Sequence, residues 1–143
     1  MFTTLTKVFY DKVLKDELLF PVFEDMSPQH IQHVGHFIAE VFGGPKFYTE
    51  DDKGSHSIMI RHHIGKMLTE QMRKRWMQLL LEAADDVGLP TDPEFRSALV
   101  GYLEWGSRIA VINSGITDNP IPENGTMPKW GWGETKGPYV NKF

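Results

Sequence analysis

Arg61-His62-His63-Ile64-Gly65-Lys66 is a short basic stretch between two amphipathic runs, at about residues 28–42 and 69–87. Apolar residues recur in both runs with the spacing of one face of an α-helix. Neighbouring residues on a helix point about 100° apart, so the two histidines of the pair cannot both reach one site. The sequence therefore predicts two helical walls beside a segment from which a single histidine points inward.

The composition indicates a soluble globule of one domain. The chain has 143 residues, of which 41% are hydrophobic and 24% charged, and the formal net charge is −4. That charge argues against a general nucleic-acid binder, which needs a basic surface. No apolar run approaches the roughly 18 residues of a membrane span, and the first residues lack the apolar core of a signal peptide, so a cytoplasmic location is expected. With no cysteine, disulfides and thiolate sites are excluded, and attention falls on the six histidines.

The periodicity predicts an all-α protein of about five helices. Ser27-Pro28, Thr69 and Asp92-Pro93 are typical helix starts, in which a small polar side chain caps the helix or proline occupies its first turn. Pro21 should end the first helix and begin a tight corner, because proline pushes the preceding residue out of the helical region. The expected helices span residues 3–19, 28–42, 58–65, 69–87 and 91–113, with a loop over 46–57.

The regular pattern stops after Asn113. The segment that follows is rich in glycine and proline and contains Trp130 and Trp132. We therefore divide the chain into a helical domain at 1–115 and an irregular tail at 116–143. Its two tryptophans predict that the tail packs on the domain or on a partner.

Three interpretations of the histidines are open on residue types alone. In the plainest, one histidine of the pair is solvated and the other is hydrogen-bonded in the core. A zinc site is a second, since His30, His33 and His36 recur at intervals of three, but no carboxylate joins them and no H-E-x-x-H motif is present. The third is haem, which needs one strong imidazole ligand, a flat apolar slot and polar groups on the opposite face.

The haem interpretation accounts for more of the chain than the other two. His63 can supply the imidazole, and Tyr10, His30 and Trp76 can supply hydrogen bonds on the opposite, distal face. The apolar residues expected to form the slot are Phe9, Phe23, Val34, Phe37, Ile38 and Met59. Each of these residues is also an ordinary core or surface residue at helical spacing, so the assignment depends on their combination.

Several stretches, in this order, resemble one known family. They are Phe9-Tyr10, then Phe23 thirteen residues after Tyr10, then Phe42-Gly43-Gly44-Pro45 with Tyr48-Thr49, then His63 thirteen residues before Trp76, then Tyr102–Arg108, and finally Pro128-Lys129-Trp130-Gly131-Trp132. Together they cover about residues 8–133. In their order and spacing they resemble the truncated haemoglobins, specifically group II.

The resemblance implies a two-over-two helical sandwich with its first helix largely missing, built around haem b. It implies that His63 binds the iron. His62 is the alternative, because some relatives carry an Arg-His pair whose histidine is the ligand. Tyr10, His30 and Trp76 would donate to a diatomic ligand, and His30 would either switch protonation near neutral pH or bind the iron when no ligand is present. Lys46, Tyr48 and Arg61 are the expected partners of the haem propionates.

The function implied is binding of O2, and of NO and CO, with possible NO dioxygenase or peroxidase-like activity that needs an unknown reductase. A haem-based gas or redox sensor is the alternative, and a helical metal-binding or interaction domain without haem is a third option. A monomer or homodimer is expected, with no nucleic-acid or membrane partner.

Overall fold

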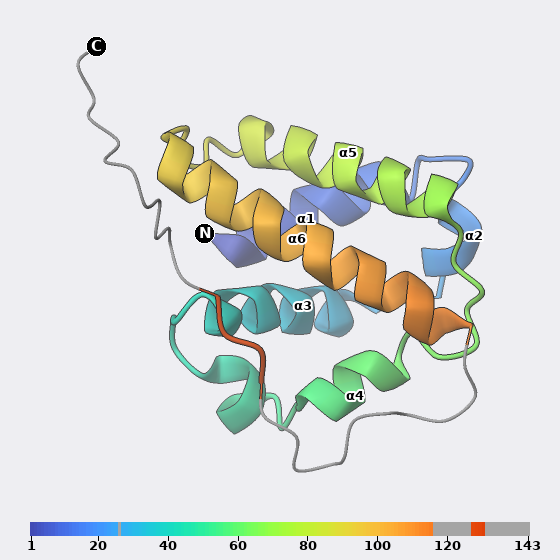
Figure 1. Ribbon diagram of the computed structural model, residues 1–143, viewed down its shortest axis with the longest axis horizontal. Helices are drawn as coiled ribbons and strands as arrows, with labels where there is room; N and C mark the ends of the chain where they lie inside the picture. Colours follow the sequence, from blue (N-terminus) through green and yellow to red (C-terminus); the bar gives the residue numbers. More distant parts are fainter. Residues whose placement is uncertain (26, 116–126, 131–143) are drawn as a thin grey trace.

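The computed structural model describes residues 1–25, 27–115 and 127–130, and all regular structure in these ranges is helical (Figure 1). This confirms the predicted all-α class. The elements are α1 (Phe2–Val13), α2 (Phe20–Phe23), α3 (Pro28–Val41), the π-helical turn η1 (Phe47–Asp51), α4 (His56–Arg61), α5 (Glu70–Asp86) and α6 (Pro93–Ser114).

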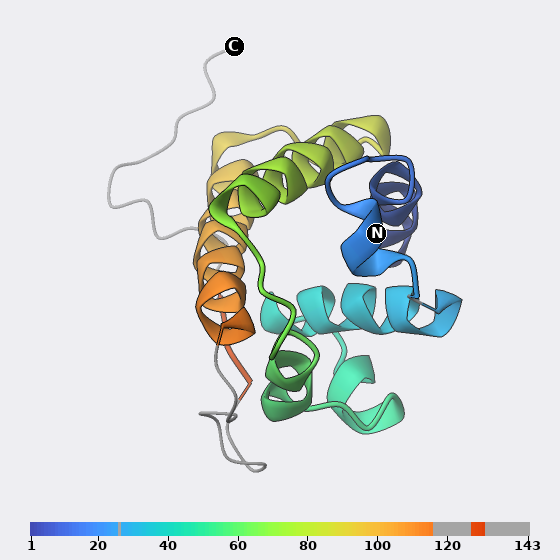
Figure 2. The ribbon, with the colours of Figure 1, turned by 90° about the vertical axis from the view of Figure 1, so that its right-hand side faces the viewer.

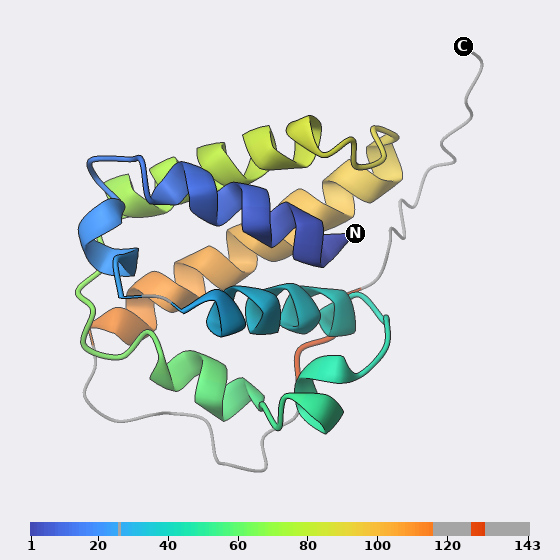
Figure 3. The ribbon, with the colours of Figure 1, turned by 180° about the vertical axis from the view of Figure 1, so that it is seen from behind.

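The longer helices form two layers, α1 with α3 and α5 with α6. Figures 1 and 3 view these layers from opposite sides, and Figure 2 shows the same helices arranged around a common centre. Helix α1 packs on both α3 and α5, and α5 packs on α6. This is the two-over-two sandwich that the sequence predicted, with the short helix α4 beyond α3 and near the end of α6 (Figure 2).

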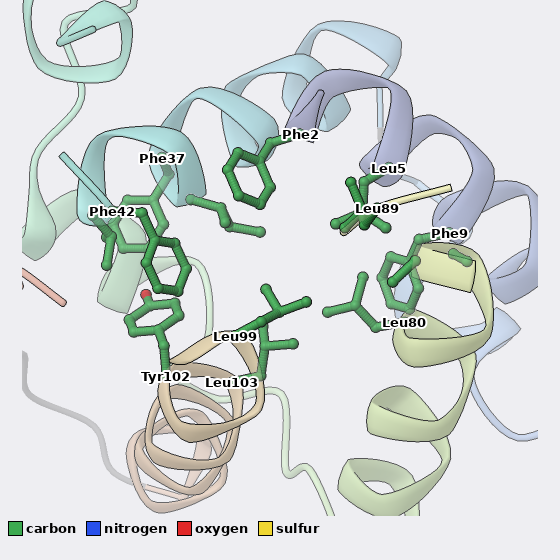
Figure 4. Close-up of a cluster of buried hydrophobic side chains, with 14 of the residues drawn as sticks. Phe2, Leu5, Phe9, Phe37, Phe42, Leu80, Leu89, Leu99, Tyr102 and Leu103 are labelled. Atoms are coloured by element: carbon green, nitrogen blue, oxygen red, sulfur yellow. The ribbon is translucent and has the colours of Figure 1, made fainter. Parts of the chain in front are cut away.

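The hydrophobic core lies between the two layers. Figure 4 shows side chains from α1, α3, α5 and α6 converging there, and burial of their apolar surface is the main force that holds the layers together. The residues with at most 2% of their surface exposed include Leu5, Phe9, Val13, Leu80, Leu99 and Leu103.

Helices α1 and α3 approach closely because α3 carries a glycine at their crossing. A Cβ atom on Gly35 would lie 2.9 Å from the Cα atom of Thr3, closer than real Cβ contacts allow. Gly35 therefore permits a contact of the two backbones that a larger residue would prevent.

The predicted helix starts are confirmed. The side chains of Ser27, Thr69 and Asp92 each accept a hydrogen bond from the backbone N–H three residues later, at 3.0–3.1 Å. Ser55 caps α4 in the same way, so this helix begins at His56 and not at residue 58 as predicted.

The predicted end of the first helix is wrong, because α1 ends at Val13 and not at residue 19. Asp16 explains the difference. One of its carboxylate oxygens accepts hydrogen bonds from the backbone N–H groups of Leu18 and Leu19, at 3.0 and 3.1 Å, and so competes with continued helix. The other accepts from the Arg75 guanidinium on α5 at 2.6 Å, which ties this turn to the opposite layer.

The segment after α4 is a turn, whereas helix was predicted as far as residue 65. Helix α4 ends at Arg61, so His62 and His63 lie in the turn that follows. Gly65 and Met67 then adopt positive φ angles of 81° and 52°, which no helix can accommodate. The predicted loop at 46–57 likewise contains one regular element, η1.

Ser114, the last residue of α6, holds this segment in place. The backbone N–H groups of Gly65 and Met67 donate to its carbonyl oxygen at 3.1 and 3.2 Å. The Leu68 N–H donates to its hydroxyl oxygen at 2.9 Å. The turn that carries His63 is therefore fastened to the end of α6.

Part of the predicted tail packs on the domain. The backbone N–H of Trp130 donates to the Val41 carbonyl oxygen at the end of α3, at 2.9 Å, and its ring lies against Tyr102 and Trp105 of α6. The remainder of the tail, including Trp132, lies outside the described residues, so the division at residue 115 stays a prediction. Among the helices that the structure describes, none is both long enough and apolar enough to cross a membrane.

We expect Ser114→Ala to lower the free energy of unfolding by about 1 kcal/mol, because the half-buried Leu68 N–H loses its acceptor. Urea unfolding followed by circular dichroism measures the change. Ser97→Ala, an exposed position on the same helix, is the control and should be nearly neutral. Equal effects of the two substitutions would show that the Ser114 anchor does not stabilise the fold.

Candidate functional site

A cavity of about 430 Å³ lies between the layers and the turn after α4. Its volume is typical of a small-molecule or cofactor site. It brings together most of the residues that the sequence singled out. The sequence-predicted residues in its wall are Tyr10, Phe23, His30, Val34, Phe37, Ile38, Met59, His62, His63 and Trp76.

His63 enters the cavity wall from the turn after α4. Burial, followed by the nearby charges of His62 and Lys66, lowers its pKa to about 4, although a hydrogen bond with the Met59 backbone carbonyl acts in the opposite direction. The imidazole is therefore neutral at pH 7. Because one ring N–H is donated to the Met59 carbonyl, the other ring nitrogen carries a lone pair, which is the form that binds a metal.

His62 lies beside His30 and not beside Met59. Its ring meets the ring of His30 edge-on, with centroids 4.8 Å apart. Burial and the charges of Lys66 and Arg61 lower the pKa of His62. Its side chain is nonetheless among the exposed ones, so the two histidines of the pair have different surroundings.

Tyr10 and Trp76 place two hydrogen-bond donors in the cavity wall from α1 and α5. Within residues 1–25, 27–115 and 127–130, neither the Tyr10 hydroxyl nor the Trp76 indole N–H has a protein hydrogen-bond partner. Burial raises the pKa of Tyr10, which keeps its hydroxyl protonated. A buried donor without a partner costs stability unless a ligand or water accepts from it.

Phe9 is not part of the cavity wall, contrary to the expected slot, but it supports both donors. Its ring lies edge-on to Tyr10 at 4.8 Å and to Trp76 at 5.6 Å between centroids. Phe9 is 1% exposed, so it is a fixed core residue that sets the orientation of its neighbours.

His30 contributes a neutral imidazole from the first turn of α3. Burial, then the charges of His62, His33 and Lys66, lowers its pKa to about 4. The expectation that His30 changes protonation near neutral pH is therefore wrong, because the group has lost its proton well below pH 7. Val34, Phe37 and Ile38 continue the same helix and form the apolar wall.

Three residues expected at the haem edge lie away from this cavity. Lys46 and Arg61 are exposed and do not line it. Tyr48 is buried, but its hydroxyl donates to the Ser55 carbonyl at 3.1 Å, and its ring lines a separate cavity of about 100 Å³. Lys66, which the sequence did not single out, does line the larger cavity.

His33 and His36, the other members of the possible zinc set, bind a carboxylate. The His36 ring lies 2.7 Å and the His33 ring 3.6 Å from oxygens of Asp52, in the loop after η1. Within the described part of the chain, no group of three or more His, Asp or Glu side chains is placed to hold a metal ion. The zinc interpretation gains no support from this arrangement.

Helix α6 supplies cavity residues that the sequence gave no reason to select. Tyr102 is 6% exposed, and burial raises the pKa of its hydroxyl, which has no hydrogen-bond partner in the described ranges. Trp105 follows it in the wall. The sequence predicted a helix here but not which of its residues line a cavity, because that depends on how α6 packs against the other helices.

Arg73 also reaches the cavity wall, but four of the five N–H donors of its guanidinium are engaged by the protein. It donates to Glu70 on its own helix at 2.6 and 2.8 Å, to Glu104 on α6 at 2.9 Å, and to the Ser107 hydroxyl at 3.3 Å. The group therefore links α5 to α6.

The cavity combines a neutral imidazole that has a free ring nitrogen with hydrogen-bond donors that lack a partner, and it lies inside a two-over-two helical sandwich like that of the truncated globins. The chain belongs to the bacterial-like globin family, which it matches over residues 1–104. This confirms the family resemblance found in the sequence.

The chain is similar to truncated hemoglobins of group II. The chain is 29% identical over 118 residues to the group 2 truncated hemoglobin YjbI of Bacillus subtilis, covering 82% of this chain and 86% of that protein. The crystal structure of a truncated oxygen-avid haemoglobin from Bacillus subtilis aligns with a TM-score of 0.66 at 29% identity, over 77% of this chain and 90% of that one. The group II truncated hemoglobin of Bacillus anthracis shares the fold, with a TM-score of 0.67 at 24% identity over 77% and 82% of the two chains.

The free energy of unfolding of the haem-free protein is expected to fall as pH is lowered from about 6.5 to about 4. His63 and His30 have a pKa of about 4 in the folded chain and an ordinary value of 6.5, so the unfolded chain binds more protons throughout that interval. Denaturant unfolding at a series of pH values measures the slope. His63→Gln, which does not titrate, should reduce it, and an unchanged slope would contradict the assignment.

Proposed function

We propose that the large cavity holds haem b through His63 and that the protein binds O2 there, together with NO and CO. The observation that carries the proposal is that the free ring nitrogen of neutral His63 shares one cavity with the partnerless donors of Tyr10 and Trp76. When bound, the haem would supply an iron centre that takes up diatomic gases. The Bacillus subtilis relative described as oxygen-avid supports the same function.

The residues present fit such a group. Phe23, Val34, Phe37, Ile38 and Met59 give the cavity the apolar wall that a flat macrocycle needs. The neutral imidazole of His63 can bind the metal, and His62 is the alternative ligand. His62 is the weaker candidate, because it packs against His30 and is more exposed.

The propionate groups at the edge of the haem are negatively charged, so a cation is expected beside them. Lys66 lies in the cavity wall and is exposed, whereas Lys46 and Arg61 lie outside the wall. We therefore assign Lys66 to the propionate side in preference to those two residues and Tyr48.

The distal donors favour tight retention of a ligand. Trp76 can only donate, Tyr10 stays protonated, and neutral His30 has one N–H to offer. Hydrogen bonds to a partner with developing negative charge contribute about 1.5–3 kcal/mol each. Slow release suits chemistry on the ligand better than transport, so NO dioxygenation or peroxide reduction, each with an external reductant, is the activity we infer.

An absorption spectrum tests the cofactor directly. Added haem should give a Soret band that titrates to one equivalent, and His63→Ala should remove the spectrum of an axially ligated haem. His62→Ala is the matched control from the same turn and should retain that spectrum. The reverse result would transfer the ligand role to His62, and no Soret band at all would overturn the proposal.

Oxygen dissociation rates test the distal donors. Tyr10→Phe and Trp76→Phe should each raise the rate by about tenfold or more, which corresponds to the loss of one hydrogen bond to a charged acceptor. Tyr48→Phe removes another buried hydroxyl, one that donates to Ser55 outside this cavity, and should leave the rate unchanged. Stopped-flow displacement of O2 by CO measures all three, and equal rates throughout would refute the distal network.

A further inference from the structure

Trp105 connects the cavity with the surface. It lies in the cavity wall on α6, yet 39% of its surface is exposed. The other oxidisable rings of the wall are less exposed. Tyr10 and Tyr102 are only 5% and 6% exposed, and Trp76 is partly buried on α5.

Trp105 belongs to a cluster of three oxidisable rings, which we call the aromatic triad. Ring centroids of Tyr102 and Trp105 lie 6.1 Å apart, those of Trp105 and Trp130 5.9 Å, and those of Tyr102 and Trp130 5.7 Å. Trp130 is held there by its backbone hydrogen bond to Val41, and its indole ring lies beside Gly101, where a Cβ atom would be 3.6 Å from the ring.

Contacts between oxidisable rings do not extend from the distal donors Tyr10 and Trp76. Within the described residues, the rings that touch Tyr10 belong to Phe9 and Phe23, and the ring that touches Trp76 belongs to Phe9. Phenylalanine is not oxidised under conditions that oxidise tryptophan or tyrosine. The chain contains no cysteine to compete, and among the described residues the triad is a cluster of contacting oxidisable rings that runs from the cavity to an exposed indole.

Proton release decides which ring of the triad holds an oxidised state. A phenol that loses an electron must also lose its proton, and the Tyr102 hydroxyl is buried without a protein acceptor in the described ranges. Trp105 is partly exposed, so water can take the proton of its indole N–H. The oxidised state should therefore settle on Trp105.

We propose that Trp105, with Trp130 beside it, is a surface oxidation site at which the protein oxidises phenols too large to enter the cavity, with hydrogen peroxide as oxidant. The site rests on the proposed haem function. In each round Trp105 gives one electron toward the cavity and its N–H proton to water, and a phenol docked at the surface restores both. After two rounds the O–O bond of the peroxide is broken and two water molecules have formed, so that one H2O2 and two phenols yield two waters and two phenoxyl radicals.

Spin trapping on the haem-loaded protein tests the site without relying on turnover. The protein is mixed with hydrogen peroxide and a nitroso spin trap, and adducts are located by peptide mass spectrometry. We expect the adduct on Trp105 or Trp130, and its loss from residue 105 in Trp105→Phe. Trp105→Tyr keeps an oxidisable ring at the exposed position and should recover an adduct there, whereas Tyr48→Phe should leave the pattern unchanged.

The variants also separate this inference from the proposed function. Peroxide consumption with a small donor should be unaffected by Trp130→Phe, since Trp130 is not part of the cavity wall, while oxidation of a bulky phenol should be impaired. Peroxide consumption with adducts only on Tyr10, Trp76 or Tyr102, or with no adduct, would overturn the surface site and leave the haem function standing. A protein that takes up no haem would overturn both.

Discussion

The neutral imidazole of His63 is the group on which the arrangement of the cavity depends. It lies in a turn and not in a helix, so no helical backbone fixes its direction. The Met59 carbonyl holds the ring from one side, and the hydrogen bonds to Ser114 hold the chain just after it. The position of this imidazole is thereby set by the end of α6, a helix far away in sequence. A change in the register of α6 would move the imidazole even though His63 does not belong to that helix.

The donors that share the cavity with this imidazole and lack a partner lower the stability of the fold. A hydroxyl buried without a partner costs about 1–3 kcal/mol, and phenylalanine would fill the same space at Tyr10 without that cost. Tyr102 repeats the situation on α6. A fold that was only a stable core would not place several such groups around one cavity. Departures of this kind from the rules of stable packing are typical of functional sites, and here they surround a single space.

The sequence predicted the beginnings of helices better than their ends. Ser27, Thr69 and Asp92 act through the backbone three residues away, so their effect is visible locally. The end of α1 depends on Asp16, whose carboxylate is held by Arg75 from the opposite layer, and no local pattern reveals that contact. The residues of the site show the same difference between what a local pattern reveals and what only packing reveals. The interval between His63 and Trp76 identified residues that meet in the cavity, whereas Lys66 and Trp105 become visible only once helices α4 to α6 are packed.

The cavity therefore has two kinds of wall, and the difference between them bears on what the protein can do. On one side, the rings that contact the donors Tyr10 and Trp76 in the described residues belong to phenylalanines, which do not pass on an oxidised state. On the other side the aromatic triad continues from the cavity to an exposed indole. A protein that only stored a gas would benefit from the donors Tyr10 and Trp76 but not from the aromatic triad. An oxidisable path through the shell of such a cavity is a liability for storage, because it exposes the ligand to electron exchange with solvent molecules. The same path is useful if the bound species has to be reduced. Under the proposed haem function, donors that retain a ligand together with an aromatic triad that reaches the surface therefore favour redox turnover over storage.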